Sequence, residues 1–259
     1  MPSLSVAIVC KNNEATIGRT LEAFAGIADE IVAVDSGSTD GTLDLLRQHN
    51  ARVIETEWKG YIGTKRFALE HCTKDWVFSV DSDESPEPEL RETIRAAVAE
   101  PRPGVGGYEI NRKVFYAGRF LEHCWQPEWR LRLCRRELAD WGGHEPHDVM
   151  CLKRGASERV ERLRGDLRHD SFVSIAEHLR TQARHSETGA DALLAMGKRG
   201  SHLRLVVSPP WAFCKQVVLR GGWRDGWRGC AAGASAAAGA LMKHAILLER
   251  SRLRDEAKE

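Results

Sequence analysis

Short apolar runs alternate with amphipathic stretches along the first hundred residues. Each run is nearly continuous in apolar residues, as expected for a strand that is buried on both faces. The stretches between them carry apolar residues at helical spacing, and Ile17, Leu21 and Phe24 form one such face. Strands separated by helices predict a parallel sheet that is covered on both faces. The predicted strands are residues 4–10, 30–35, 51–56 and 75–81, and the predicted helices follow Asn12 or Asn13, contain Leu43, Leu45 and Leu46, and span residues 60–72 and 86–99.

The pattern changes after residue 104. Residues 107–118 and 130–136 alternate apolar and polar positions as antiparallel strands do, with loops rich in Trp, Gly, His and Pro between them. Residues 172–197 predict an amphipathic helix, and the Ser-Pro-Pro sequence at 208–210 predicts a break. A basic segment with tryptophans follows, and then a helical tail flanked by Lys and Arg.

The balance of charge excludes some partners. In 259 residues, 38 Lys and Arg face 37 Asp and Glu, so that the formal net charge is only +1. Bulk binding to nucleic acid usually requires a strongly basic domain, and we therefore expect no nucleic-acid partner. Seven scattered cysteines without a C-x-x-C pair fit a reducing cytoplasm better than a disulfide framework or a zinc ribbon.

The sequence shows no stretch typical of a targeting or spanning segment. The N-terminal residues lack a charged region and a long apolar core, and they indicate a first strand in place of a signal peptide. The longest weakly apolar run, residues 230–242, consists mostly of Ala and Gly. We expect this run to be too short and too small-sided for a transmembrane helix.

Acidic residues stand at the end of the fourth predicted strand. Ligands of such folds bind at the carboxyl ends of the strands, where Asn12, Asp35 and Asp81 are expected. Asp81 and Asp83, two residues apart at a strand end, can converge on one divalent cation that prefers oxygen ligands. The alternative is a solvated acidic loop that caps the next helix.

Two further groups precede this strand. Asp35, in the sequence VDSGSTDGT, can accept hydrogen bonds from a base or a ribose, and Asp40 can do the same or cap the helix. This turn lacks the glycine patterns of a P-loop and of a dinucleotide-binding fold, and a plain turn is the alternative. Lys65 and Arg66 are placed to reach a diphosphate, or else they form a solvated helix face.

The sequence GGHEPHDVM gathers titratable residues in one loop or strand start. His144, Glu145, His147 and Asp148 follow one another within five positions, and one carboxylate can act as a general base. A zinc site is the competing interpretation, but the spacing of H-E-x-x-H on a helix is absent. His169 is a further candidate ligand for a metal or a phosphate, or a structural histidine.

These groups, in this order, resemble the glycosyltransferase family 2 proteins with the GT-A fold. The resemblance is closest to the branch that contains bacterial lipopolysaccharide core glucosyltransferases of the WaaE/KdtX type. It covers nearly the whole chain, and DSGSTDGT combined with the strand-end DSD is its most specific part. The matching segments are SVAIVCKNNEATIGRTLEA, DEIVAVDSGSTDGT, KGYIGTKRFALE, DWVFSVDSDE, RLRLCRR, PHDV and LRGGWRDGWRG.

The resemblance implies an α/β fold of the GT-A type, a Rossmann-like mixed sheet flanked by helices, with a C-terminal helical appendage. It implies a catalytic domain over residues 1–170, with a nucleotide-sugar-binding half at 1–103 and an acceptor half at 104–170. Residues 171–259 would form a helical C-terminal region.

The implied activity is an inverting, metal-dependent transfer of a sugar from a nucleotide-sugar, expected to be UDP-linked. The expected acceptor is a cell-envelope glycan or a lipid-linked acceptor such as lipopolysaccharide core, and the expected cofactor is Mg²⁺ or Mn²⁺. One alternative is a non-catalytic protein that binds sugar nucleotides or glycans. Another is a sugar nucleotidyltransferase, although KNNEATIGRT does not supply the glycine-rich basic loop that such an enzyme needs.

The resemblance also assigns roles to single residues. Asp35 would contact the nucleobase, Asp81 the ribose or the sugar, and Asp83 the metal. The His-Asp of PHDV falls where this branch carries His-Glu, which makes Asp148 the candidate base and leaves Glu145 as the alternative. The expected nucleotide-sugar-binding residues are Val9, Lys11, Asn12, Asp35, Lys65, Arg66, Asp81 and Arg130, and the expected metal ligands are Asp83 and His169.

Although the net charge of the whole chain is close to zero, a basic segment lies near the C-terminus. Residues 198–228 hold seven basic residues against the single acid Asp225, a net charge of +6, and Trp211, Phe213, Trp223 and Trp227 lie among them. Basic residues with tryptophan suit an anionic membrane surface. We therefore expect a cytoplasmic protein that is peripheral on the inner face of the cytoplasmic membrane. The alternative is an appendage that packs its aromatic residues on the catalytic domain or on a second subunit.

Overall fold

The computed structural model describes residues 2–145, 147–172 and 174–256. Internal packing divides the chain into two compact units. Unit 1 comprises residues 1–113 and 128–170, and unit 2 comprises residues 114–127 and 171–259. Residues 114–127, part of the antiparallel region, thus pack with the C-terminal helices.

Unit 1 is built on a mixed sheet. The strands of the chain are β1 (Leu4–Cys10), β2 (Glu30–Asp35), β3 (Arg52–Glu55), β4 (Trp76–Asp81), β5 (Glu84–Pro86), β6 (Val105–Tyr116), β7 (Arg119–Phe120), β8 (Trp129–Arg135), β9 (Ala139–His144), β10 (His147–Leu152) and β11 (Arg159–His169). Of these, β7 and the end of β6 belong to unit 2. The main sheet has the order β3-β2-β1-β4-β8-β6-β11-β5, and β7 pairs with β6. Strands β1 to β4 run parallel, whereas β8 pairs antiparallel with both β4 and β6. The predicted α/β fold, a mixed sheet of the GT-A kind with helical flanks and C-terminal helices, is confirmed.

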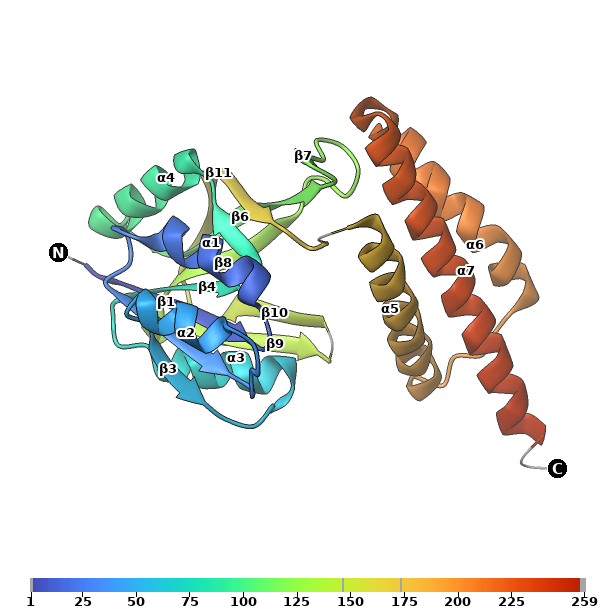
Figure 1. Ribbon diagram of the computed structural model, residues 1–259, viewed down its shortest axis with the longest axis horizontal. Helices are drawn as coiled ribbons and strands as arrows, with labels where there is room; N and C mark the ends of the chain where they lie inside the picture. Colours follow the sequence, from blue (N-terminus) through green and yellow to red (C-terminus); the bar gives the residue numbers. More distant parts are fainter. Residues whose placement is uncertain (1, 146, 173, 257–259) are drawn as a thin grey trace. The chain divides into compact units, whose positions relative to one another are not determined.

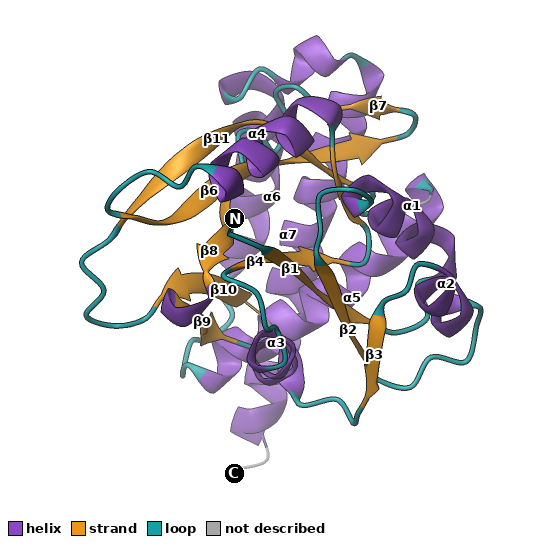
Figure 2. Cartoon of the chain, turned by 90° about the vertical axis from the view of Figure 1, so that its left-hand side faces the viewer, coloured by secondary structure: helices purple, strands orange, loops and turns teal. Residues whose placement is uncertain are grey.

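Helices cover both faces of the parallel strands (Figure 2). They are α1 (Glu14–Phe24), α2 (Thr42–Gln48), α3 (Gly60–Glu70) and α4 (Pro88–Ala99). Alternate residues of β1 point to opposite faces, because the side chains of a strand alternate. Val6 and Ile8 belong to the core that includes Leu21 of α1, whereas Ala7 belongs to the core that includes Ala68 of α3.

The register of the parallel strands brings the polar strand ends to one edge. Cys10 at the end of β1 is opposite Asp35 at the end of β2, and Val9 is opposite Asp81 at the end of β4. The predicted gathering of polar residues at the carboxyl edge is therefore present in the fold.

A separate hairpin, β9–β10, completes unit 1. Its strands pair antiparallel, and His144 is opposite His147 at its tip. Trp141 of β9 is 1% exposed and shares a small core with Met150 of β10 and Cys134 of β8. The hairpin is thereby packed on the sheet at β8, and it also contacts α3.

Unit 2 is helical. The helices α5 (Ile175–Ala195) and α6 (His202–Cys214) both pack against the long helix α7 (Trp227–Glu256), which lies between them (Figure 1). The buried ring of His178 in α5 lies 2.9 Å from the hydroxyl of Tyr116 and 2.9 Å from that of Ser235. Burial lowers the pKa of His178, so this polar contact holds a neutral histidine inside the unit.

Two expectations from the sequence were wrong. The fourth helix begins at Pro88, because Glu84 to Pro86 form β5, a strand that pairs with β11. The predicted break at 208–210 is absent, since α6 continues through Pro209 and Pro210. The fixed φ of proline is itself a helical value. Each proline lacks an N–H donor, and the packing of α6 on α7 offsets the free energy that the lost hydrogen bonds cost.

The last helix is longer than the apolar run that the sequence analysis considered. The weakly apolar run at 230–242 is part of a helix of 30 residues. Judged by length and composition, α7 is the one helix in the described part of the chain that is long and apolar enough to cross a membrane, and 33% of its apolar window is buried inside the protein. The same test is met by core helices of soluble proteins.

Candidate functional site

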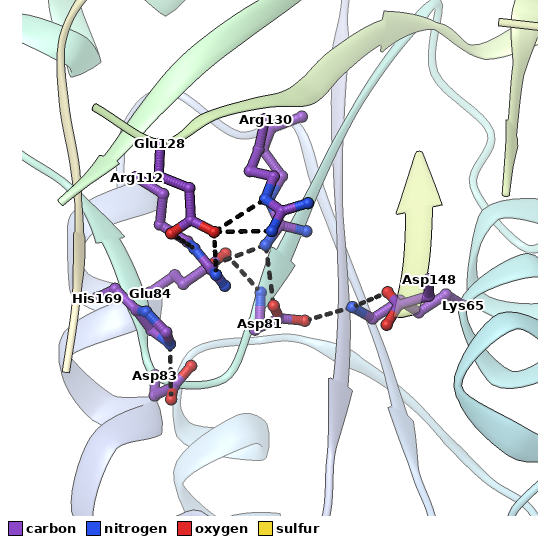
Figure 3. A network of polar contacts seen from close by, with 10 residues as sticks. Lys65, Asp81, Asp83, Glu84, Arg112, Glu128, Arg130, Asp148 and His169 are labelled. Atoms are coloured by element: carbon purple, nitrogen blue, oxygen red, sulfur yellow. Dashed lines mark hydrogen bonds and ion pairs between the residues drawn. The ribbon is translucent and has the colours of Figure 1, made fainter. Parts of the chain in front are cut away.

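Asp81 lies at the centre of a polar network at the end of β4 (Figure 3). Its Oδ1 is 2.7 Å from Nζ of Lys65, and its Oδ2 is 2.9 Å from a guanidinium nitrogen of Arg132. Burial alone would raise the pKa of this carboxyl, but Arg132 and Lys65 hold it well below its ordinary value. Asp81 is therefore an anion that is already paired with two cations.

Behind Asp81 lies a carboxylate that the sequence analysis did not single out. Glu84 is 0% exposed, and its Oε1 is 2.7 Å from the guanidinium of Arg132 and 3.3 Å from that of Arg112. Its Oε2 accepts the backbone N–H of Asp81 at 3.1 Å. A buried anion with two arginines and a backbone donor is well compensated, and it fixes the direction of the Asp81 backbone.

The arginine network extends toward the surface through Glu128. Arg112 donates to both of its carboxylate oxygens, at 2.8 and 3.0 Å, and Arg130 donates at 2.7 Å. Burial opposes the charge of Glu128, but the bonds from Arg112 and Arg130 lower its pKa to about 2. The guanidinium of Arg130 remains partly exposed and is the outermost cation of this group.

Lys65 joins Asp81 to the β9–β10 hairpin. It lies one turn into α3, where Gly60 begins the helix, and its side chain is 10% exposed. Its Nζ is 2.8 Å from Oδ2 of Asp148 and 4.7 Å from the ring centre of Trp141. The same ammonium thus contacts Asp81, the expected contact of the ribose or the sugar, and Asp148, the candidate base.

These residues line a pocket of about 260 Å³. Asp148, the second residue of β10, faces it, and its carboxylate is largely buried. Both signs of charge converge there, which is typical of a site for a charged ligand. The lining residues are Lys65, Asp81, Arg112, Arg130, Leu131, Arg132, Trp141, His147, Asp148, Val149 and Met150.

Glu145, the alternative base, is engaged elsewhere. Its two carboxylate oxygens accept the backbone N–H groups of Tyr61 and Ile62, each at 3.0 Å, at the N-terminus of α3. A carboxylate in this position satisfies helix donors that have no partner within the helix and faces the positive end of the helix dipole. Glu145 therefore caps α3, and Asp148 is the carboxylate of this hairpin that faces the pocket.

Asp83 lies next to His169, which ends β11. Oδ2 of Asp83 is 3.4 Å from Nε2 of His169, and backbone pairing of Asp170 with Asp83 fixes this proximity. Burial of the imidazole opposes its charge, but the carboxylate beside it raises the pKa of His169. In the residues that the structure describes, no group of three or more His, Cys, Asp or Glu is arranged to hold a metal. The pair fits a cation that takes two protein ligands and completes its shell with phosphate oxygens and water.

The turn after β2 is held together by its own polar groups. Asp35 is 0% exposed, and its Oδ2 accepts the N–H groups of Gly37 and Ser38, each at 2.8 Å. The side-chain oxygen of Asn12 accepts the N–H of Thr39 at 2.8 Å, which ties this turn to the end of β1. Asp35 thus closes an Asx-type turn, and contact with a base stays a prediction.

The remaining predicted binding residues lie at several places in unit 1. Val9 is half-buried at the end of β1, and Lys11 is exposed directly after it. Arg130 lines the pocket, whereas Arg66 bonds Asp140 of β9 at 2.9 Å and is absent from the described lining. The structure therefore brings Lys65, Asp81, Arg130 and Asp148 together and directs Arg66 elsewhere.

A scan against family models matches residues 5–161 to "Glycosyl transferase family 2". Among curated proteins, the lipopolysaccharide core biosynthesis glycosyltransferase LpsC of Rhizobium meliloti is 30% identical over 256 residues, which covers 97% of this chain and 94% of that protein. An uncharacterized glycosyltransferase of Rickettsia typhi is 30% identical over 227 residues, which covers 85% of this chain and 78% of that protein.

The similar solved structures have lower sequence identity. The glucosyl-3-phosphoglycerate synthase of Mycobacterium tuberculosis, crystallised with Mn²⁺, uridine diphosphate and phosphoglyceric acid, is 20% identical and has a TM-score of 0.49. The match covers 77% of this chain and 80% of that one.

Proposed function

The chain belongs to glycosyltransferase family 2, and on this basis we propose that it is an inverting, metal-dependent transferase that moves a sugar from a UDP-sugar to a cell-envelope glycan. The observation that carries the proposal is the pairing of Asp81 and Asp148 with one ammonium, that of Lys65, inside a single pocket. Inversion needs a base on the face of the sugar opposite the leaving group, and we assign this role to Asp148.

Asp148 is the proposed base. Its carboxylate removes the proton from the acceptor hydroxyl as the acceptor oxygen attacks the anomeric carbon. The hairpin holds it rigidly, since Trp141 and Met150 are buried beneath it. The ammonium of Lys65 pairs with this carboxylate at 2.8 Å.

The cations of the pocket are the proposed diphosphate-binding groups. Lys65, Arg130 and Arg132 line the pocket and are proposed to supply donors for phosphate oxygens. Asp81 is the proposed contact of the ribose or the sugar. Asp35, Val9, Lys11 and Asn12 are the proposed contacts of the nucleobase. Arg66, which bonds Asp140 of β9, is not proposed as a contact of the donor.

Asp83 and His169 are the proposed holders of Mg²⁺ or Mn²⁺. A bound divalent cation supplies charge compensation for the leaving diphosphate without a proton. The Asp170 N–H bonds the carbonyl oxygen of Asp83 at 2.8 Å, and this backbone pairing keeps Asp83 beside His169.

For the acceptor we propose lipopolysaccharide core or a lipid-linked glycan. The support is the 30% identity with LpsC over nearly the whole of both chains. Such an acceptor suits a cytoplasmic protein that works at the inner face of the cytoplasmic membrane.

The proposal is tested with a panel of UDP- and other nucleotide-sugars in the presence of Mg²⁺ or Mn²⁺. The measurements are thermal stabilisation of the protein and release of nucleoside diphosphate. We expect one UDP-sugar to stabilise the protein and to be hydrolysed slowly in a metal-dependent way. Binding without any turnover would favour the non-catalytic alternative, and failure of every nucleotide-sugar to bind with either metal would refute the proposal.

A further inference from the structure

Large apolar side chains are exposed in one segment of unit 2. Nine of the exposed large hydrophobic residues fall between residues 203 and 227, on α6 and the turns that follow it. Leu203 is 72% exposed, Val206 69% and Trp211 58%. Single exposed apolar residues are normal, but such a concentration marks an interaction surface. The nine residues are Leu203, Val206, Val207, Trp211, Phe213, Val218, Leu219, Trp223 and Trp227.

The exposed residues of α6 form one face of the helix. Residues at positions i, i+3, i+4, i+7 and i+8 lie on the same side of an α-helix. The α6 face, as we name it, has this spacing and consists of Leu203, Val206, Val207, Pro210 and Trp211.

The opposite side of α6 is already occupied. Gly233 of α7 lies against Phe213 and against Val217 in the π-helix Lys215–Leu219, and at the other end Gly200 lies against Leu248. These close approaches hold α6 on α7 with the α6 face directed away from α7. In the described part of the chain this face remains in solvent.

Tryptophans and arginines continue the surface beyond α6. Trp223, in the short helix Gly222–Asp225, and Trp227, the first residue of α7, are both more than half exposed. The guanidinium of Arg224 lies 5.2 Å from the ring of Trp223, and that of Arg228 lies 4.6 Å from the ring of Trp227. Paired Trp and Arg side chains, with an apolar body and a polar end, suit a boundary between water and an apolar phase.

The outward-facing charges of this surface are basic. Arg204 is seven residues before Trp211 and Lys215 four residues after it, so both lie along one border of the α6 face. The single acid of the segment, Asp225, turns inward and accepts the N–H groups of Glu122, His123 and Cys124. The outward charge of residues 198–228 is therefore carried by basic side chains.

The charge decides between possible occupants. Docking of a second copy through this face would bring two segments of net charge +6 together, which is unfavourable. An anionic phospholipid surface accepts the apolar face and attracts the basic border at the same time.

We propose that the α6 face, together with Trp223 and Trp227, docks on the surface of an anionic phospholipid bilayer, with α6 parallel to the membrane plane. The inference names the surface responsible for the membrane location and rests on unit 2 alone, so it does not depend on the sugar-transfer chemistry. It assigns lipid contact to α6, because α7 packs against both α5 and α6.

The test is sedimentation of the full chain with vesicles of phosphatidylcholine containing 30% phosphatidylglycerol as the probe. At low salt we expect binding to these vesicles, at least about tenfold weaker binding to phosphatidylcholine alone, and a similar loss in 0.5 M salt. Val206→Glu and Trp211→Ala should each weaken binding at least about fivefold. The matched controls Val160→Glu and Trp58→Ala change exposed apolar residues of unit 1 and should leave binding unchanged.

Three results would overturn the proposal. They are absence of binding to the anionic vesicles at low salt, equal binding by V206E and wild type, and retention of the protein in the vesicles through an alkaline carbonate wash. The last would show that a helix spans the bilayer. Because V206E lies outside the pocket, its release of nucleoside diphosphate in solution should match that of wild type, which separates failure of this proposal from failure of the proposed function.

Discussion

The ammonium of Lys65 lies 2.8 Å from the carboxylate of Asp148, and this contact joins two elements that are 83 residues apart in the sequence. Lys65 comes from α3 and Asp148 from β10, and each alone is an ordinary surface residue type. These two residues and Asp81, the second carboxylate in contact with Lys65, line the pocket. The proposed chemistry rests on this group of three residues.

Lys65→Met should uncouple this group of charges. The substitution leaves Asp81 and Asp148 without their shared cation, and breaking a largely buried ion pair costs about 3 kcal/mol of the free energy of unfolding. In a D148N background the same substitution should cost at least about 1 kcal/mol less, because one of the two pairs is already broken. Urea unfolding of the four proteins measures this coupling, and additive effects would contradict the proposed pairing.

Asp83→Ala should remove the response to metal. We expect the thermal stabilisation that Mn²⁺ adds to UDP binding to disappear, and metal-dependent release of nucleoside diphosphate to fall at least about 100-fold. Asp44→Asn, a change of an exposed carboxylate on α2, is the control. Metal-dependent stabilisation that persists in D83A would show that the cation is held by other groups.

Glu145→Gln should loosen the hairpin without abolishing chemistry. A neutral amide accepts the α3 N–H groups of Tyr61 and Ile62 less strongly than a carboxylate, and we expect a loss of about 1 kcal/mol in unfolding free energy. The rate of nucleoside diphosphate release should fall far less than in D148N. A loss of rate equal to that of D148N, with unchanged stability, would identify Glu145 as the base.

Glu128→Gln should change how stability depends on pH. The pKa of Glu128 in the folded protein is about 2, below its ordinary value of 4.5, because the bonds from Arg112 and Arg130 outweigh its burial. A lowered pKa means that the carboxylate stabilises the fold above pH 4.5, and this contribution is lost as the pH falls toward 2. The urea midpoints of wild type and E128Q should therefore differ more at pH 7 than at pH 3. An equal difference at both pH values would contradict the assignment.

The parallel half of the fold was predictable because its signals are local. The bounds expected for β1 and β2 agree with the structure, and Ile17, Leu21 and Phe24 form the buried face of α1. Buried strands are short apolar runs, and no long-range contact is needed to recognise them.

The site was predictable only in part. Asp81 and Asp83 were recognised because they lie at the end of a predicted strand, but Glu84 was not singled out. Its burial depends on Arg112 and Arg132, which β6 and β8 bring beside it from distant parts of the chain. Likewise, nothing in the sequence HEPHD distinguishes Glu145 from Asp148, since α3 alone determines which carboxylate is engaged.

In the C-terminal helices, tertiary contacts overrode a local sequence signal. Pro209 and Pro210 indicated a break, yet the tertiary contact of α6 with α7 keeps the helix continuous. Because a break was predicted there, the sequence analysis did not identify the apolar face of α6. The spacing of this face is evident only when residues 203–211 are taken as one helix.

The most direct test of the account is the turnover of D148N with the UDP-sugar that the panel identifies. Release of nucleoside diphosphate and the dissociation constant of the UDP-sugar are measured for wild type, D148N and the control Asp140→Asn, which alters a carboxylate outside the described lining of the pocket. We predict that kcat of D148N falls at least about 100-fold while the dissociation constant changes less than about threefold, and that D140N keeps its kcat. A D148N protein that turns over within about threefold of wild type would contradict the assignment of Asp148 as the base.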